Sequence, residues 1–302
     1  MLKLLYVTGI TGHSGHWFVE KLISEDYKGR IRCIVRAGSD TGFLKESGLD
    51  VDIVTGDLND QEFITSTISG CSTVLHIASI HFSRNVVKAA LDNNVDWLIL
   101  VHTTGRYSKY KVASAEYIDI EDYVLSFRNR MGITVLRPTM IYGSSRDQNM
   151  YKLITFLHKV KFFPMFGKGE NLMQPVHARD LGNAYYSVIV NRSTTFNKEY
   201  NLPGKSPLTY MELVRTVSDT LKRKNVIIKI PLWLSIFAAR IYNALDKNAI
   251  ISVEQVLRMQ EDKAFGYEDA TCDFGYSPIS FEDGIIEEVN EYLAKHNFHR
   301  TK

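Results

Sequence analysis

A glycine turn near the start of the chain is the clearest chemical feature of the sequence. Three glycines, each three residues after the last, lie in the segment Thr8-Gly-Ile-Thr-Gly-His-Ser-Gly15, between an apolar run at 4–7 and a helical pattern. Without Cβ atoms the backbone of such a turn can approach a pyrophosphate closely, and the following helix directs N–H groups and partial positive charge at it. This order predicts a dinucleotide-binding site rather than an ordinary tight turn.

A tyrosine and a lysine four residues apart form the second candidate group. Tyr107 and Lys111 follow the apolar run 97–101, and they share one helical face if a helix begins here. An ordinary tyrosine has a pKa of about 10, and a nearby ammonium stabilises the phenolate, so such a pair can act as a general acid or base. Thr103 and Thr104 carry hydroxyls that can hold a substrate oxygen. The spacing alone is common by chance, but its place at the end of a parallel strand favours a catalytic role.

The residues after the second apolar run bear on the choice of cofactor. In NAD-binding folds a carboxylate about twenty residues after the glycine turn accepts a hydrogen bond from the ribose 2′-hydroxyl. Here Arg36 follows the run 31–35, and a guanidinium pairs well with a 2′-phosphate. The sequence therefore favours NADP, while the nearby Asp40 leaves NAD open. Asp57, after the third run, is expected to meet the adenine edge.

The elements that must position these groups alternate along the chain. Apolar runs predict strands at 4–7, 31–35, 51–58, 72–79, 97–101 and 133–137, with helical patterns between them. We expect an α/β fold with a Rossmann-type doubly wound parallel sheet and a small, mostly helical C-terminal substrate lobe. The dinucleotide-binding domain is expected over residues 1–165, with 174–195 returning to it, and the substrate lobe over 196–302.

Other segments have local interpretations. The patterns predict helices at 116–130, 150–160, 208–222 and 281–296, an apolar loop at 162–167, a strand at 226–230, and an apolar helix at 232–245. The last of these is expected to be a lid or core helix of the lobe rather than a membrane contact. His13, His16, His76 and His177 are expected to be structural rather than catalytic.

Composition excludes several classes of protein. The chain has 302 residues, 45% of them hydrophobic, and its 36 Lys and Arg against 34 Asp and Glu give a net charge of +2. That balance argues against a nucleic-acid partner. The three cysteines are widely spaced, so neither a disulfide framework nor a metal site is predicted. With no targeting segment and no run of roughly 18–20 apolar residues, a cytoplasmic protein without membrane contact is expected.

The motifs, taken in order, resemble a known family. The matching segments are the glycine turn, Gly56-Asp57-Leu58, His76-Ile77-Ala78-Ser79, Tyr107 with Lys111, Leu136-Arg137-Pro138 through Tyr142-Gly143, and Gln174 through Asp180. Over nearly the whole chain they are similar to an extended or atypical short-chain dehydrogenase/reductase, of the NAD(P)-dependent epimerase/dehydratase family.

This resemblance implies an oxidoreductase or epimerase that transfers a hydride to or from a hydroxyl or carbonyl carbon of a nucleotide-sugar or similar small molecule. Tyr107 would be the acid/base, Lys111 would tune it and bind the nicotinamide ribose, and Thr103 or Thr104 would orient the substrate. Homodimers are usual in the family. The implied cofactor contacts are Gly9, Thr11, Gly12, His13, Ser14, Gly15, Arg36, Asp57, Leu58, Ile77, Ala78, Ser79, Lys111, Pro138, Thr139 and Tyr142.

One departure from the family pattern leaves an alternative open. Family members usually have a longer segment between the strand-end Ser/Thr and the catalytic Tyr, whereas here Thr104 and Tyr107 are nearly adjacent. Tyr110 is a second candidate acid/base, although Ser114 rather than a lysine follows it by four residues. The alternative function is a catalytically weak NAD(P)-binding sensor or assembly factor.

Overall fold

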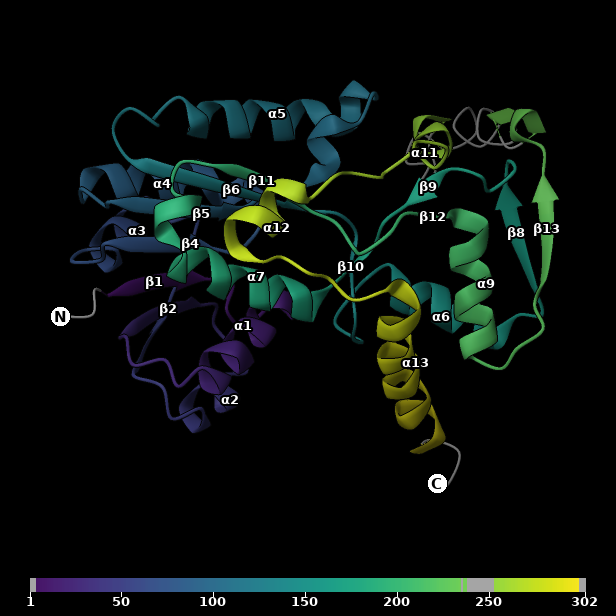
Figure 1. Ribbon diagram of the computed structural model, residues 1–302, viewed down its shortest axis with the longest axis horizontal. Coiled ribbons are helices and arrows are strands. Elements are labelled where there is room, and N and C mark those ends of the chain that lie inside the picture. Colours follow the sequence, from purple (N-terminus) through teal and green to yellow (C-terminus); the bar gives the residue numbers. More distant parts are fainter. Residues whose placement is uncertain (1–3, 235, 238–252, 299–302) are drawn as a thin grey trace.

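A parallel sheet of seven strands forms the centre of the computed structural model, which describes residues 4–234, 236–237 and 253–298 (Figure 1). The strand order is β11-β6-β5-β4-β1-β2-β3, and every neighbouring pair is parallel. The order reverses between β1 and β4, which creates a crevice at the carboxyl ends of these strands. The strands are β1 (Leu5–Thr8), β2 (Ile31–Val35), β3 (Val51–Thr55), β4 (Thr73–His76), β5 (Trp97–Val101), β6 (Gly132–Pro138) and β11 (Glu199–Leu202).

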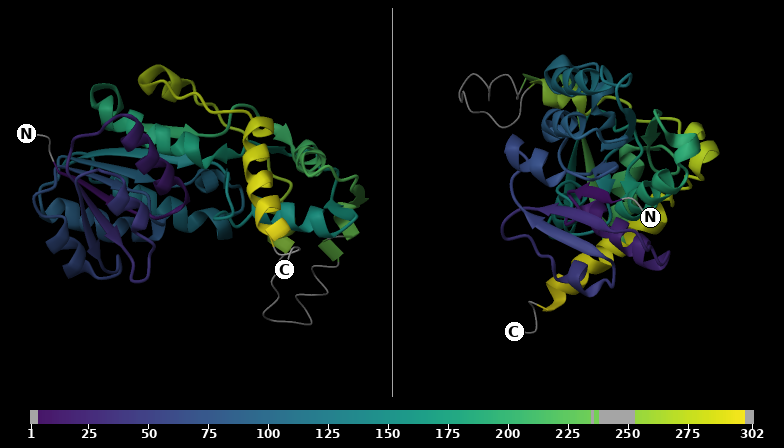
Figure 2. Two further views of the ribbon diagram at one scale, coloured as in Figure 1. Left: turned by 90° about the horizontal axis from the view of Figure 1, so that it is seen from below. Right: turned by 90° about the vertical axis from the view of Figure 1, so that its left-hand side faces the viewer.

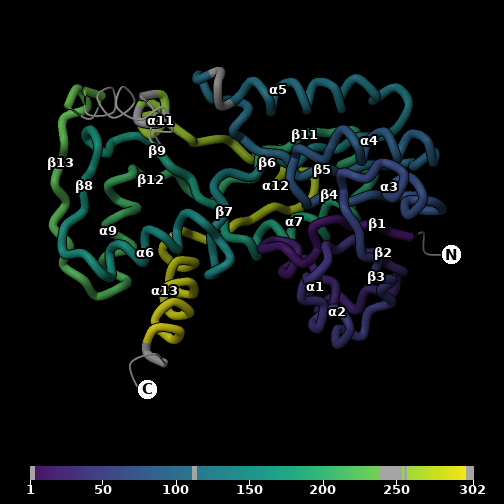
Figure 3. The backbone as a smooth tube through the Cα atoms, turned by 180° about the vertical axis from the view of Figure 1, so that it is seen from behind, coloured from purple at the N-terminus to yellow at the C-terminus, as the bar shows by residue number. Residues whose placement is uncertain are grey.

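Helices cover both faces of this sheet, because successive side chains of a strand point to opposite faces. In β1, Leu5 and Val7 belong to one buried apolar cluster and Tyr6 to the other. Figures 1 and 3 show the two helical layers on either side of the sheet. One layer holds α1 (His13–Ser24), α2 (Gly42–Glu46), α7 (Ala178–Val190), α8 (Arg192–Thr195) and α12 (Glu268–Phe274); the other holds α3 (Gln61–Thr67), α4 (Ser83–Asp92) and α5 (Lys111–Leu125). The doubly wound Rossmann-type fold is therefore confirmed.

A smaller lobe lies beyond the carboxyl edge of the sheet, at the end of the molecule opposite the N-terminus (Figure 2). Its own buried cluster joins helices α6, α9 and α13 to strand β8. The predicted capping box is present, with Thr209 and Glu212 satisfying each other's backbone N–H groups at the start of α9. Two short 3₁₀ turns, η1 (Ile80–Phe82) and η2 (Thr104–Tyr107), follow β4 and β5 in the main domain. The helices of the lobe and its connections are α6 (Met150–Lys159), α9 (Tyr210–Thr220), α11 (Val253–Arg258) and α13 (Phe281–Phe298). Their strands are β7 (Ile141–Tyr142), β8 (Phe162–Phe166), β9 (Leu172–Met173), β10 (Val176–His177), β12 (Leu208–Thr209) and β13 (Val226–Ile230).

Three local expectations differ from the structure. Residues 162–167 are not a loop, because β8 pairs in parallel with β13 over five residues. The helix expected at 116–130 is α5, which begins and ends five residues earlier. The expected boundary at residue 196 is wrong, because β11 joins the main sheet and α12 packs on it, whereas α6 and β8 belong to the lobe.

No helix within the described ranges is long and apolar enough to cross a membrane. The expected helix 232–245 lies mostly outside the described residues. Residues 232–234 and 236–237 of it are helical.

Candidate active site

The glycine turn joins β1 to α1 at the crevice in the sheet. Gly9 has a φ of 75°, and a Cβ atom on it would lie 2.5 Å from the backbone nitrogen of Ala78. A Cβ atom on Gly15 would lie 2.4 Å from the carbonyl oxygen of Gly9. The N-cap of α1 is Gly12, which makes no side-chain cap hydrogen bond. The uncapped N–H groups and the Cβ-free backbone fit the pyrophosphate of a dinucleotide.

The side chains of Ser14 and His13, within the turn, have surroundings of their own. The Ser14 hydroxyl accepts a hydrogen bond from Tyr185 at 3.1 Å, and that serine is buried against α7. His13 lines a separate cavity of about 420 Å³, between α1, the segment after β7 and α13. Burial lowers the pKa of His13. Of the predicted contacts, Ser14 is buried, whereas Thr11 and His13 are partly exposed. The backbone N–H groups at the start of α1 are the groups that all three can offer an anion.

The other predicted cofactor contacts lie at the carboxyl ends of neighbouring strands. Arg36 is exposed directly after β2, and Asp40 accepts the N–H of Gly42 at 3.0 Å. Asp57 is exposed after β3, where it accepts the N–H of Asn59 at 2.9 Å, and Leu58 behind it is buried. Ile77, Ala78 and Ser79 follow β4, and the backbone of Ala78 lies against the glycine turn. The structure thus brings these segments to one edge of the sheet.

His76, at the end of β4, is a satisfied core histidine, as expected. Its Nδ1 lies 2.6 Å from the Thr8 hydroxyl and its Nε2 lies 3.2 Å from the Ser79 carbonyl. Burial lowers the pKa of His76 to about 3, so the ring is neutral at physiological pH. His177 caps α7 through Nδ1, but its buried Nε2 has no hydrogen-bond partner.

Tyr107 and Lys111 do not share a helical face. Tyr107 ends the 3₁₀ turn η2, and α5 begins only at Lys111, with Tyr110 as its N-cap in an extended conformation. The i, i+4 argument for this pair therefore fails, because residues 108–110 are not helical. The second candidate, Tyr110, precedes the buried Ser114 by one helical turn.

The two threonines expected to hold a substrate oxygen have partners of their own. The hydroxyl of Thr103 accepts the N–H of Gly105 at 3.0 Å, so its own proton is free for donation. Thr104 is buried, and its hydroxyl donates to the carbonyl of Pro138 at 3.2 Å. Thr103 thus keeps the more suitable group for a substrate oxygen.

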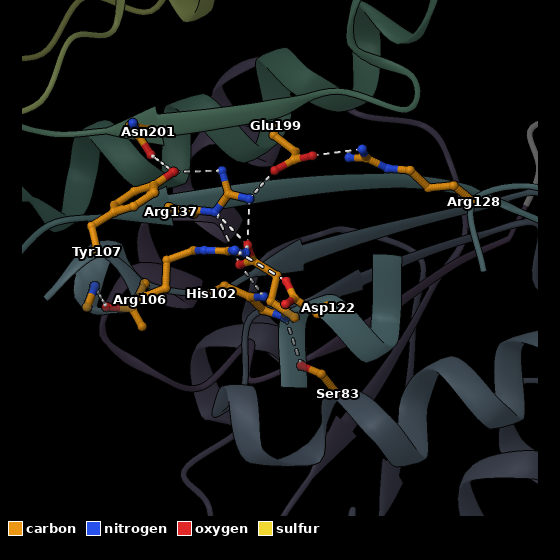
Figure 4. A network of polar contacts seen from close by, with 12 residues as sticks. Ser83, His102, Arg106, Tyr107, Asp122, Arg128, Arg137, Glu199 and Asn201 are labelled. Carbon is orange, nitrogen blue, oxygen red and sulfur yellow. Dashed lines mark hydrogen bonds and ion pairs between the residues drawn. The ribbon is translucent and has the colours of Figure 1, made fainter. Parts of the chain in front are cut away.

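A buried polar network, which no local sequence pattern indicates, lies beneath Tyr107 (Figure 4). Glu121 of α5 is fully buried, and it accepts hydrogen bonds from Arg137 Nε at 2.9 Å and from His102 Nδ1 at 2.8 Å. Arg106 also pairs with Glu121. The other nitrogen of His102 lies 3.1 Å from the hydroxyl of Ser83 on α4. One carboxylate thus joins two guanidinium groups and an imidazole, which offsets its desolvation.

The network ends at the phenol of Tyr107. Arg137 Nη1 donates to the Tyr107 hydroxyl at 3.1 Å, and that hydroxyl donates to Asn201 Oδ1 at 3.3 Å. Arg137 also pairs with Glu199, which Arg128 holds from the other side at 2.7 Å. Figure 4 shows Arg137 between the carboxylates and the tyrosine. Tyr107 is 46% exposed, so a buried ion-pair network orients a phenol that solvent can reach.

The order Ser83, His102, Glu121 resembles the serine–histidine–carboxylate arrangement of hydrolases, but it cannot act as one. Ser83 is fully buried, so no substrate reaches its hydroxyl. Burial and the neighbouring guanidinium groups of Arg137 and Arg106 lower the pKa of His102 to about 3. The neutral imidazole therefore connects α4 to α5.

The structure corrects one predicted cofactor contact. Tyr142 was expected over the nicotinamide, but only 1% of it is exposed, and its ring packs against His177 and Phe281 inside the lobe. Pro138 ends β6, and the hydroxyl of Thr139 donates to the carbonyl of Gln174. The side chain of Tyr142 is part of the lobe core because β7 turns away from the main sheet and pairs with β10.

A pocket of about 300 Å³ adjoins the exposed side of Tyr107. The segment after α11 forms its far wall, where Glu261 accepts hydrogen bonds from the Ser108 hydroxyl at 2.7 Å and from the Lys109 N–H at 2.5 Å. Phe265 from this segment packs on the Tyr107 ring, with 5.5 Å between the two ring centroids. Burial lowers the pKa of Lys263, which also lines the pocket. In the part of the chain that the structure describes, no cluster of three or more His, Cys, Asp or Glu could hold a metal ion.

The sheet topology and the glycine turn define a Rossmann protein of the extended short-chain dehydrogenase/reductase type. The chain belongs to the NmrA-like family, whose model matches residues 1–283. It is 22% identical over 348 residues to a decarboxylating sterol-4-alpha-carboxylate 3-dehydrogenase of Dictyostelium discoideum, covering 95% of this chain and all of that one. It is also 22% identical to an N-acetyl-alpha-D-glucosaminyl-diphospho-ditrans,octacis-undecaprenol 4-epimerase of Escherichia coli O157:H7, covering 64% of this chain and 67% of that one. Among solved structures, the dTDP-glucose 4,6-dehydratase DesIV of Streptomyces venezuelae, with NAD and TYD bound, shares the fold with a TM-score of 0.74 and 17% identity over 98% of both chains.

Proposed function

We propose that this protein binds a nicotinamide dinucleotide at the glycine turn and transfers a hydride to or from a carbon that bears a hydroxyl or carbonyl group. The observation that carries the proposal is the pair of hydrogen bonds that orient the half-exposed phenol of Tyr107, from Arg137 and to Asn201. The uncapped N-terminus of α1 and the glycine backbone support dinucleotide binding. The relatives are dehydrogenases and epimerases, and DesIV binds NAD.

In this mechanism Tyr107 exchanges the proton. A nicotinamide dinucleotide held by the backbone of the glycine turn would provide the hydride chemistry. Tyr107 gives a proton to the substrate oxygen during reduction or takes one from it during oxidation. A hydrogen bond donated by Arg137 to the phenol oxygen stabilises that oxygen after its proton has left. Thr103, whose hydroxyl proton is free, is suited to hold the substrate oxygen.

We further propose NADP as the preferred cofactor, because Arg36 is exposed at the end of β2, where a ribose 2′-phosphate would lie. For the substrate we propose a nucleotide-sugar or a similar hydroxyl compound. Support comes from DesIV, a dTDP-glucose dehydratase, and from the relative named for a glycosyl-diphosphate substrate. Oxidation followed by reduction at the same carbon would give epimerisation from the same residues.

A second candidate function is that of a nucleotide-binding sensor with little catalysis. One observation in its favour is that α5 begins only at Lys111, so that Tyr107 lies outside the helix that carries the lysine. Another is that the residue four positions after Tyr110 is Ser114 rather than a lysine. The NmrA-like family includes non-catalytic members. Both candidates share the cofactor site, so they differ only in turnover.

Thermal unfolding in the presence of NADPH, NADP, NADH or NAD tests the cofactor. A ligand at a hundred times its Kd adds about 2.7 kcal/mol to the free energy of unfolding, which shifts the midpoint visibly. We expect a larger shift with the phosphorylated pair, and Arg36→Ala should remove that preference. No shift with any of the four would refute dinucleotide binding.

Single-turnover hydride transfer with a panel of nucleotide-sugars then separates the two candidates. Tyr107→Phe should abolish turnover while leaving the nucleotide-induced thermal shift, and Tyr110→Phe serves as the matched control. Loss of turnover only in Tyr110→Phe would assign the acid/base to Tyr110. Nucleotide binding with no turnover of any substrate in the wild-type protein would favour the sensor.

A further inference from the structure

The two-stranded sheet of β8 and β13 has apolar side chains on both faces, and the exposed Lys229, which pairs with Met165, interrupts the inner one. On its inner face, Phe163, Met165 and Ile227 pack into the lobe core beside α6 and α9. The register pairs Val226 with Phe162 and Ile228 with Pro164, and these four alternate with the inner residues. The outer face is therefore also lined by apolar side chains. A sheet with one solvated face normally shows polar residues there, so this pattern needs an explanation.

Large apolar side chains are exposed on this outer face and just after it. The exposed fractions are 52% for Phe162, 63% for Val226 and 48% for Ile228. After β13 ends, Trp233 is 69% exposed and Phe237 is 56% exposed. We call these five residues the outer apolar face. Figures 1 and 3 show β8 and β13 at the end of the lobe, with β13 outermost. Phe163, Met165 and Ile227 face the lobe core, so the alternate residues lie on the opposite face of the sheet.

The two chain segments that carry the outer apolar face are rich in basic residues. Residues 156–170 and 219–237, which contain it, hold seven Lys and Arg against two Asp and Glu, a net charge of +5. The whole chain has a net charge of only +2, so the remaining residues sum to −3. The seven basic residues are Lys159, Lys161, Lys168, Lys222, Arg223, Lys224 and Lys229. Positive charge is thus concentrated in the segments that carry the exposed aromatic and aliphatic side chains.

From this combination we propose that the outer apolar face docks the protein on the surface of a bilayer that contains anionic lipids. Aromatic and aliphatic side chains enter the boundary between head groups and acyl chains, and Lys and Arg attract the lipid phosphates. Trp and Phe beside Lys side chains are the residue types that such an interface favours. A nucleic acid would use the charge but not the apolar side chains, and a second copy of this chain would bring the same positive charge into contact with itself.

A cavity of about 710 Å³ lies where β8 and β13 end. Its lining combines Lys168 and Lys229 with the carboxylates of Glu170 and Asp262, so its charge is balanced. Docking would therefore use the exposed apolar side chains and the basic residues of these segments rather than this cavity. This docking would be independent of the dinucleotide site, because α1 lies at the other end of the molecule (Figure 1).

Vesicle co-sedimentation of the full-length protein tests the proposal. We expect binding to phosphatidylcholine vesicles that contain phosphatidylserine, little binding to phosphatidylcholine alone, and weakening with added salt. Lys222→Gln combined with Lys224→Gln should weaken binding on the order of tenfold or more. The control variant, Lys45→Gln with Lys88→Gln, makes the same charge change at exposed sites on α2 and α4 and should bind like the wild type.

Tryptophan fluorescence gives a second readout that does not depend on charge. Trp97 is buried and Trp17 is partly buried, so Trp233 is the exposed tryptophan of the three. Its emission should shift to the blue on vesicle binding and should be quenched by lipids brominated on their acyl chains. Trp233→Phe should abolish the fluorescence change and retain sedimentation, whereas Trp233→Glu should lose both.

Three results would overturn the proposal. One is sedimentation that is equal for the paired lysine variant and its control. Another is wild-type emission that does not change when vesicles bind. The third is a dimer in solution, detected by analytical ultracentrifugation, that Trp233→Glu dissociates, since this would assign the face to a second copy of the chain. Nucleotide-induced thermal shifts measured in the same variants should stay unchanged, so failure here is distinguishable from failure of the cofactor proposal.

Discussion

Arg137 Nη1 lies 3.1 Å from the hydroxyl oxygen of Tyr107, while Nε of the same guanidinium holds the buried carboxylate of Glu121 at 2.9 Å. The side chain of Arg137 is only 5% exposed, and that of Glu121 is fully buried. The position of a half-exposed phenol is therefore fixed by an ion pair that water does not reach. Arg137 therefore contributes both to the stability of the fold and to the orientation of the Tyr107 phenol.

Replacing Arg137 by Met should destabilise the fold much more than removing the phenol hydroxyl. Arg137→Met leaves Glu121 with fewer donors in a buried place, and we expect a loss of about 3 kcal/mol in the free energy of unfolding. Tyr107→Phe removes two hydrogen bonds at a half-exposed side chain, and should cost about 1 kcal/mol or less. Urea unfolding of both variants measures the difference. Equal losses would show that the buried pair does not contribute to stability.

Gly9→Ala should disturb the glycine turn more than a substitution at a glycine of the same backbone conformation. Gly9 has a φ of 75° and Gly70 a φ of 77°, but only Gly9 would place its Cβ against the backbone of Ala78. Gly70→Ala should cost roughly 1–2 kcal/mol, the strain of a left-handed residue. Gly9→Ala should cost more and should also lose the nucleotide-induced thermal shift. A nucleotide response equal to that of Gly70→Ala would separate the turn from cofactor binding.

The sequence contained enough information for the main sheet because its strands are local apolar runs. The fully buried pattern of β5, for instance, is visible in the run Trp97 to Val101. The glycine turn and the capping box of Thr209 and Glu212 also depend only on neighbours in the sequence. By contrast, β11 is a short strand of mixed polarity that joins the sheet edge through its partner β6, so the local pattern does not show that the main sheet continues beyond residue 196.

The polar network could not be predicted, since its members are distant in the sequence. Glu121 and Arg137 are 16 residues apart, and Tyr107 and Asn201 are 94 residues apart. The sequence shows the motif around Arg137, but no local pattern indicates which carboxylate its guanidinium group pairs with. The same reason applies to residues 162–167, because β8 becomes a strand by pairing with β13, far along the chain. The predicted roles of Tyr107, Lys111 and the threonines stay predictions.

The carboxylate of Glu261 should control exchange at the loop that carries Tyr107. It accepts the N–H of Lys109 at 2.5 Å and the hydroxyl of Ser108 at 2.7 Å. Glu261→Ala removes both acceptors, and we expect faster hydrogen exchange at the Lys109 amide and a loss of roughly 1–3 kcal/mol in stability. Glu261→Gln retains a carbonyl acceptor and should show a smaller effect.

Asp262 provides the control for this experiment. It accepts the N–H of Leu172 at 2.8 Å, and so Asp262→Ala should speed exchange at Leu172 but not at Lys109. Hydrogen exchange followed by NMR resolves the two amides. Unchanged exchange at Lys109 in Glu261→Ala would show that the segment after α11 does not hold this loop.

Glu288 on α13 should make the fold less stable as pH rises. Burial, reinforced by Asp147, raises the pKa of Glu288 to about 10 from an ordinary value of 4.5. Its Oε2 accepts the N–H of Gly143 at 2.8 Å, and the protonated carboxyl can donate to Asp147. Between these two pKa values the folded state holds a proton that the unfolded state releases. The free energy of unfolding should therefore fall with rising pH in this range, by about 1.4 kcal/mol per pH unit from this group.

Glu288→Gln removes this titration and keeps both a donor for Asp147 and an acceptor for Gly143. We expect the variant to be more stable than the wild type at alkaline pH, with a flatter dependence of stability on pH. Glu287→Gln is the matched control at a side chain that is 42% exposed, and it should retain the wild-type slope. Urea unfolding between mildly acidic and mildly alkaline pH measures the slopes. If wild type and Glu288→Gln have the same slope, Glu288 is ionised in the folded protein, and its contact with Asp147 is repulsive rather than stabilising.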